Sequence, residues 1–136
     1  MKKLFSFLLV LACILAVSCT KDTVKDDNGN EGKLMYEQIS QDEAKRIMDS
    51  EKDVVILDVR QQDEFDSGHI PDAILIPYTE IENKAEEMLP DKDKLILVYC
   101  RSGRRSKIAA GSLVNLGYTN VKEFGGIIDW QYETVK

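Results

Sequence analysis

LILVYCRSGRRS, residues 95–106, joins five apolar residues to a cysteine, a short turn and the start of a helical pattern. A continuous apolar run of this kind predicts a strand that is buried on both faces of a parallel sheet. The first N–H groups of a helix have no partner within it, so a turn that gathers them around one point attracts an anion. We therefore predict that the thiolate of Cys100 is stabilised there and acts as a nucleophile.

Strand and helix patterns alternate through most of the chain. The strand patterns lie at residues 35–39, 54–59, 73–76, 95–99 and 121–124. The helix patterns lie at residues 40–48, 61–66, 79–88, 106–116 and 126–132. Because the links are short, the order predicts an α/β fold of three layers, with a mainly parallel five-stranded sheet and helices on both faces. Ligands of such sheets bind beyond the carboxyl ends of strands, where residues 58–60 and the cysteine turn are expected.

Local signals refine the helix ends. Ser40 with Glu43, and Thr79 with Glu82, fit the capping-box pattern, and we expect Ile81, Ala85 and Met88 to form a buried stripe. Pro90 is expected to stop the helix before it, and Gly117 to follow the last turn of another. Ser106 is expected to be the N-cap of the helix at residues 106–116.

Four blocks of the sequence, taken in order, resemble the rhodanese (thiosulfate sulfurtransferase) family. They are the turn at residues 100–106, Asp58-Val59-Arg60, the block EFDSGHIPDA at residues 64–73, and FGGIIDW at residues 124–130. Each block alone is modest evidence, but together they span nearly everything from about residue 34 to the C-terminus. The type resembled is a single-domain bacterial rhodanese exported as a lipoprotein.

The resemblance implies a catalytic role for Cys100. Its sulfur would attack the outer sulfur of thiosulfate or another sulfane donor, expel sulfite and remain as a persulfide that a thiophilic acceptor discharges. Backbone N–H groups would hold the charged terminal sulfur, and Gly103 would allow the left-handed backbone that such a cradle requires. The substrate-binding residues implied are Arg101, Ser102, Gly103, Arg104, Arg105 and Ser106. No cofactor is implied.

The three arginines of the turn are expected to have different roles. Arg101 is the best candidate to contact the sulfonate oxygens of the donor. Arg105 would do the same or brace the turn through its guanidinium fork. Arg104 is as readily a solvated surface charge as a substrate contact.

Residues outside the turn are expected to be mainly structural. Asp58 should tie down the cysteine turn, and Arg60 should pair with Glu64. His69 is the only histidine; a Cys–His dyad is the alternative to a role in packing and hydrogen bonding within its turn. Trp130 is expected to pack in the core. One histidine and one unmodified cysteine do not make a credible metal site.

Two other function classes remain as alternatives. Rhodanese-like domains also serve as non-enzymatic binding or sulfur-carrier modules. Phosphatases and arsenate reductases of similar fold use a cysteine turn of the form Cys-x5-Arg. Here Arg105 follows Cys100 after only four residues, and the smaller ring of N–H groups favours a single sulfur atom over a phosphoryl group.

The N-terminus is expected to lie outside the domain. Residues 1–18 combine two lysines with a long apolar run, as in a secretory signal peptide. Small residues before Cys19 resemble a lipobox, which predicts acylation of Cys19; Cys13 is a weaker candidate, and an ordinary signal peptide is the alternative. Residues 19–33 are polar and predict a flexible tether, which leaves residues 34–136 as the domain.

Charge and targeting signals limit the partners. The formal net charge is −6, and removal of the two signal lysines makes it more negative. This argues against nucleic acid and against electrostatic binding to anionic lipid. We expect a monomer that takes a small sulfur-containing anion and a thiophilic acceptor. Its lipid would hold it to a membrane of the bacterial envelope, facing the periplasm or the cell surface. The outer membrane is favoured because no aspartate follows Cys19 directly.

Overall fold

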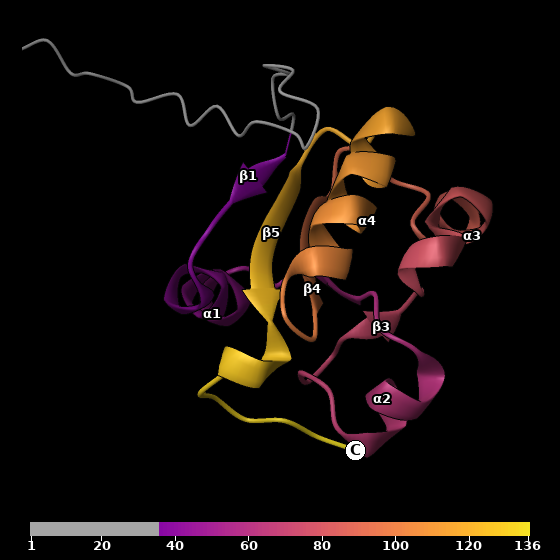
Figure 1. Cartoon of the computed structure of the whole chain (residues 1–136). Helices are drawn as coiled ribbons and strands as arrows, with labels where there is room; N and C mark the ends of the chain where they lie inside the picture. Colours follow the sequence, from indigo (N-terminus) through magenta and orange to yellow (C-terminus); the bar gives the residue numbers. More distant parts are fainter. Residues whose placement is uncertain (1–35) are drawn as a thin grey trace, which may run out of the picture.

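The sheet sets the framework of the domain. The computed structural model describes residues 36–136, and its five strands lie in the order β1-β5-β4-β2-β3, each pair parallel. Figure 1 labels β1, β5, β4 and β3 of this sheet. The strands are β1 (Glu37–Gln38), β2 (Val54–Asp58), β3 (Ile74–Leu75), β4 (Leu95–Cys100) and β5 (Val121–Gly126). The central position of β4 explains its continuous apolar sequence, because both faces and both edges are covered.

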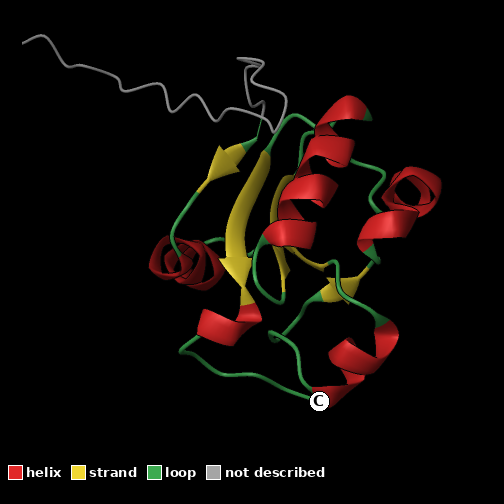
Figure 2. Cartoon of the chain, viewed as in Figure 1, coloured by secondary structure: helices red, strands yellow, loops and turns green. Residues whose placement is uncertain are grey.

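Side chains of β4 alternate between two cores. Ile96, Val98 and Cys100 pack on the face that is covered by α3 (Ile81–Met88) and α4 (Arg104–Asn115). Leu97 and Tyr99 pack on the other face, beneath α1 (Gln41–Ser50) and the C-terminal segment. Figure 2 shows helices on both sides of the strands. The prediction of a three-layer α/β fold with a parallel five-stranded sheet is confirmed.

Two predicted helix starts are wrong. α4 begins at Arg104, two residues before the expected start, and its N-cap is Gly103, so Ser106 lies inside the helix. The chain at residues 78–80 forms a 3-10 turn, and α3 starts at Ile81 without a side-chain cap, so Thr79 and Glu82 form no capping box. Met88 is 44% exposed and does not extend the buried stripe of Ile81 and Ala85.

Other helix signals are confirmed in part. The Ser40 hydroxyl accepts from the Glu43 N–H at the start of α1, which is one of the two bonds of the predicted capping box. Gly117 follows α4 in the left-handed conformation, as predicted. α2 (Gln62–Ser67) ends at Gly68. The predicted helix at residues 126–132 is only a 3-10 turn, η2 (Ile127–Asp129).

The N-terminal predictions lie outside the described residues. They comprise the signal at residues 1–18, Cys13, Cys19 and the tether at residues 19–33. Within residues 36–136, no helix has the length and apolar character needed to span a membrane.

Candidate active site

Cys100 is the last residue of β4, and three residues separate it from the first turn of α4. Its side chain is fully buried. The Gly103 N–H donates to Sγ at 3.0 Å, and the Ser106 Oγ lies 3.4 Å from Sγ. Gly103 has φ +97°, a conformation that a residue with a Cβ adopts only with strain. The turn therefore aims a backbone donor at the sulfur, as the sequence predicts.

The end of β5 holds this turn in place. The Ile128 N–H donates to the Arg101 carbonyl at 3.1 Å. A Cβ on Gly126 would lie 2.0 Å from the Arg101 carbonyl oxygen, so only glycine allows the two backbones to approach this closely. The block at residues 124–130 thus supports the cysteine turn directly.

Arg105 braces the turn. Its guanidinium donates two hydrogen bonds to the Glu64 carboxylate, at 2.7 and 2.8 Å. These bonds are the main reason that the pKa of Glu64 is lowered from 4.5 to about 2. The interaction joins α4 to α2 and leaves the Arg105 fork facing a carboxylate.

Arg101 and Arg104 differ from Arg105 in their surroundings. Both are exposed, as is Ser102. Within residues 36–136 neither Arg101 nor Arg104 forms an ion pair. Their charges are therefore available at the surface beside the buried sulfur.

Ser106 and Glu123 form a buried polar pair behind the cysteine. Ser106 Oγ lies 2.6 Å from Glu123 Oε1, and the Gly125 N–H donates to the same oxygen at 2.8 Å. Glu123 is only 3% exposed. The sequence interpretation missed Glu123, although its i,i+2 spacing from the buried Val121 in a strand pattern predicts the same inward face.

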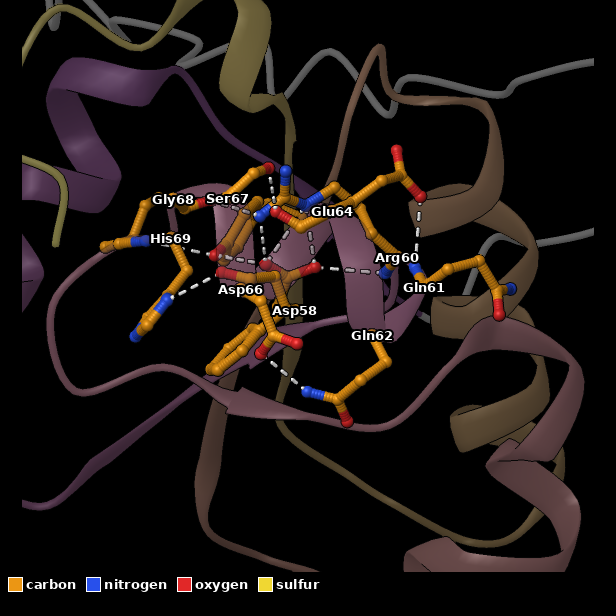
Figure 3. Close-up of polar contacts among 12 residues, drawn as sticks. Asp58, Arg60, Gln61, Gln62, Glu64, Asp66, Ser67, Gly68 and His69 are labelled. Atoms are coloured by element: carbon orange, nitrogen blue, oxygen red, sulfur yellow. Dashed lines mark hydrogen bonds and ion pairs between the residues drawn. The ribbon is translucent and has the colours of Figure 1, made fainter. Parts of the chain in front are cut away.

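Asp58 and Arg60 form a second polar cluster (Figure 3). The Arg60 guanidinium donates to Asp58 and to the Gly68 carbonyl, so the predicted pairing of Arg60 with Glu64 is wrong. Glu64 pairs with Arg105 instead. Asp58 also accepts from the Tyr99 hydroxyl at 2.6 Å. Asp58 therefore reaches the cysteine turn only through Tyr99, the residue before Cys100, and not by direct contact.

The Tyr99 hydroxyl is a buried link that the sequence interpretation missed. It accepts from the Ile70 N–H at 3.1 Å while it donates to Asp58. Burial, followed by the charge of Asp58, raises the pKa of Tyr99. The phenol therefore stays neutral and keeps its donor.

His69 belongs to the packing of its own turn. Its ring stacks on Phe65 at 3.7 Å between centroids, and Nδ1 lies 3.0 Å from the Phe65 carbonyl oxygen. Trp130 contacts Phe124, with ring centroids 5.7 Å apart, and packs against the core beneath α1. No cluster of three or more His, Cys, Asp or Glu side chains in residues 36–136 is placed to hold a metal ion.

Comparison with known proteins identifies the type of domain. The profile of the family described as "Rhodanese-like domain" matches residues 40–133. Thiosulfate sulfurtransferase GlpE of Coxiella burnetii is 36% identical over 99 residues, which cover 72% of this chain and 90% of that protein. YrkF of Bacillus subtilis, named as a candidate sulfur carrier, is 34% identical over 109 residues, which cover 79% of this chain but only 58% of YrkF.

A solved structure supports the same assignment. The structure described as "rhodanese with anions from E. coli" is 35% identical to this chain and superposes with a TM-score of 0.58. The match covers 61% of this chain and 98% of that one. With the parallel sheet and the cysteine turn between β4 and α4, these matches show that the chain belongs to the rhodanese-like domain family.

Proposed function

We propose that this protein moves a sulfane sulfur from thiosulfate or a related donor to a thiophilic acceptor through a persulfide on Cys100. Relatives that are named thiosulfate sulfurtransferase support sulfurtransferase activity in general. The observation that carries the finer proposal is the position of the sulfur. Sγ lies at the N-terminal end of α4, where the Gly103 N–H donates to it at 3.0 Å and thereby favours the thiolate.

The proposed reaction needs no oxidant. The Cys100 thiolate attacks the outer sulfur of thiosulfate, and a new sulfur–sulfur bond forms. The bond between the two sulfur atoms of thiosulfate breaks, and its electron pair leaves with sulfite. The terminal sulfur of the persulfide carries the negative charge, which N–H groups of the turn stabilise. Attack of the acceptor on that terminal sulfur returns the Cys100 thiolate.

Arg101 is the proposed contact for the donor's sulfonate. Because the Cys100 side chain is fully buried, a donor reaches the sulfur only when the exposed part of the turn moves aside. Arg101 and Ser102 form that exposed part. A free guanidinium there would attract and orient the anion, whereas Arg105 is already paired with Glu64.

Steady-state turnover of thiosulfate and cyanide tests this proposal. The Cys100→Ser variant should lose turnover, and Arg101→Ala should raise KM for thiosulfate about tenfold, as expected for a lost charged hydrogen bond. Arg46→Ala, which removes an exposed arginine from α1, is the matched control and should stay near the wild-type KM. Unchanged turnover by Cys100→Ser would contradict the proposal.

A sulfur-carrier role is the second candidate, because YrkF bears that description. A carrier would accept sulfur on Cys100 but release it only to a dedicated partner protein. Persulfide formation without turnover by small thiols or cyanide would favour the carrier over the enzyme.

The arrangement of Arg105 argues against phosphatase chemistry. In a Cys-x5-Arg site the arginine must be free to hold a phosphoryl group, but here both ends of the Arg105 fork are bonded to Glu64. We expect negligible turnover of aryl phosphates. Phosphatase activity that disappears in Cys100→Ser, without sulfur uptake, would overturn the sulfurtransferase proposal.

We also propose that the domain is tethered to the bacterial envelope by a lipid on Cys19. The support is the sequence alone: an apolar run, small residues before Cys19, and a polar segment after it. An anchor of this kind would present the domain to small anions on the outer side of the cytoplasmic membrane.

A further inference from the structure

Glu123 is a buried carboxylate that the proposed sulfur transfer does not use. It lies on β5, is 3% exposed, and faces the first turns of α4. Its Oε1 accepts from the Gly125 N–H at 2.8 Å and lies 2.6 Å from the Ser106 Oγ. Burying a carboxylate is costly, so a carboxylate held one hydroxyl away from the nucleophile calls for a chemical explanation.

The Ser106 hydroxyl has only one hydrogen to donate. Its possible acceptors are Glu123 Oε1 at 2.6 Å, the Gly103 carbonyl at 3.0 Å and the Gly125 carbonyl at 3.4 Å. The shortest contact, to a carboxylate, is the strongest. When the hydrogen points to Glu123, a lone pair of Ser106 Oγ is left for Cys100 Sγ, 3.4 Å away. The thiol hydrogen of Cys100 can therefore be donated to Ser106.

We propose that Glu123, acting through the Ser106 hydroxyl, is the proton acceptor for the Cys100 thiol. The S–H proton moves to Ser106 Oγ as the Ser106 proton moves to Glu123 Oε1. One S–H and one O–H bond break, two O–H bonds form, and the products are a thiolate and a neutral carboxylic acid. The total charge of the group is unchanged. The inference rests on the proposed function only in that the thiolate formed is the one that attacks the sulfur donor.

The proton has a route from Glu123 to solvent. Glu123 lines an open surface depression together with Gly103 and Lys107, and the lining contains neither Cys100 nor Arg101 nor Arg105. The relay thus connects the buried sulfur to a depression at the surface, which Ser102 and Gly103 of the turn border on one side.

Other titratable groups face Glu123 from the surrounding elements. Lys107 of α4 and Asp129 of η2 line the same depression, and Cys100 of β4 lies beyond Ser106. Tyr36, just before β1, has a raised pKa because of burial and, second, the charge of Glu123. Tyr36 therefore stays protonated at neutral pH. Among these groups, only Cys100 is joined to Glu123 by hydrogen bonds, through the Ser106 hydroxyl.

Glu123→Gln separates proton transfer from support of the fold. The glutamine side chain has the same shape, and its carbonyl oxygen can still accept from Ser106 and Gly125, but it cannot take a proton. A purely structural role would leave the thiol titration unchanged. A purely electrostatic role would make the thiolate form more easily once the negative charge is removed. Only the relay predicts that the amount of thiolate, which is nearly constant with pH in the wild type, varies steeply with solvent pH in Glu123→Gln.

The test is the pH profile of the thiolate, read from its ultraviolet absorbance after subtraction of the Cys100→Ser spectrum, and from the alkylation rate with iodoacetamide. In the wild type, one proton is shared between Cys100 and Glu123. The thiolate signal and the rate should therefore change less than about twofold between about pH 5 and 8. In Glu123→Gln, both should climb about tenfold per pH unit below a single midpoint.

Ser106→Ala gives the second variant. It removes the hydroxyl link but keeps the Glu123 charge, and it should show the same steep profile; adding Glu123→Gln to it should cause no further steepening. A Glu123→Gln profile as flat as the wild type, or with more thiolate at low pH, would overturn the relay. These readouts need no sulfur donor, so a wild type that fails to form a persulfide contradicts the proposed function and leaves the relay result intact.

Discussion

At the scale of single residues, the site is organised by two carboxylates with different tasks. Glu64 is partly exposed and holds the Arg105 fork by two short hydrogen bonds. Glu123 is buried and meets Ser106 behind the sulfur. Arg105 and Ser106 are consecutive residues of α4, so the two carboxylates hold neighbouring positions of the helix that follows Cys100.

The Glu64–Arg105 pair makes a prediction about pH. The pKa of Glu64 is lowered from 4.5 to about 2, so its ion pair contributes stability above the unfolded value and loses it as pH falls toward 2. Glu64→Gln should lower the free energy of unfolding by about 1–2 kcal/mol at pH 7. In denaturant titrations at several pH values, the gap between the variant and the wild type should close between about pH 4.5 and 2.

A matched control comes from the exposed pair of Glu80 and Lys84, which are four residues apart. Glu80→Gln should change the free energy of unfolding by less than about 0.5 kcal/mol, because water screens an exposed pair. A gap for Glu64→Gln that stays constant down to pH 2 would show that the ion pair does not hold α2 to α4.

At the scale of elements, the cysteine turn is fixed by the end of β5 as much as by β4 and α4. The sequence predicts the strand–turn–helix order because apolar runs and helical periodicity are local signals. It does not predict that α4 starts at Arg104, since the glycine N-cap lacks the side chain by which helix starts are usually identified. Ser106 has a hydroxyl of the kind that commonly caps helices, so the sequence pattern placed the N-cap there.

The contacts that the sequence interpretation missed at the site join residues that are far apart in the sequence. Glu64 and Arg105 are 41 residues apart in sequence, as are Tyr99 and Asp58. Such pairs depend on which strands become neighbours, and a sequence pattern does not specify partners across that distance. The sequence interpretation therefore placed Cys100 in a turn with a backbone donor, but it did not find Glu123 or the partners of Arg60 and Arg105.

The close approach of β5 to the turn can be tested with two glycines. Gly126→Ala places a Cβ 2.0 Å from the Arg101 carbonyl oxygen and should destabilise the protein by about 3 kcal/mol or more. Gly111→Ala, inside α4, meets nothing within 4 Å and should stabilise it by about 0.5–1 kcal/mol. Denaturant unfolding measures both, and a Gly126→Ala protein as stable as wild type would contradict the contact.

At the scale of the whole molecule, one α/β domain presents Cys100 at the carboxyl end of a central parallel strand. This is where ligands bind in open parallel sheets. The alternation of strands and helices predicted the architecture because each apolar run had to be covered on both faces. The charge pattern adds a local group of arginines to an otherwise acidic chain, which suits a small anionic donor.

The proposed anchor is tested with the full chain. Cys19→Ala should release the protein from the membrane fraction of its host, because the lipid is the expected attachment. Cys13→Ala is the matched control and should leave the protein membrane-bound. A wild-type protein without lipid mass, together with a Cys19→Ala protein that stays in the membrane fraction with its signal uncleaved, would contradict the lipoprotein proposal.

Intact-mass spectrometry after brief exposure to thiosulfate tests whether Cys100 carries the transferred sulfur. The wild type should gain the mass of one sulfur atom, lose it on addition of a small thiol, and yield a Cys100 peptide that carries the added sulfur. Cys100→Ser should gain nothing. A wild type that gains no sulfur from thiosulfate or another sulfane donor, or a Cys100→Ser protein that gains as much as the wild type, would show that Cys100 does not carry the sulfur.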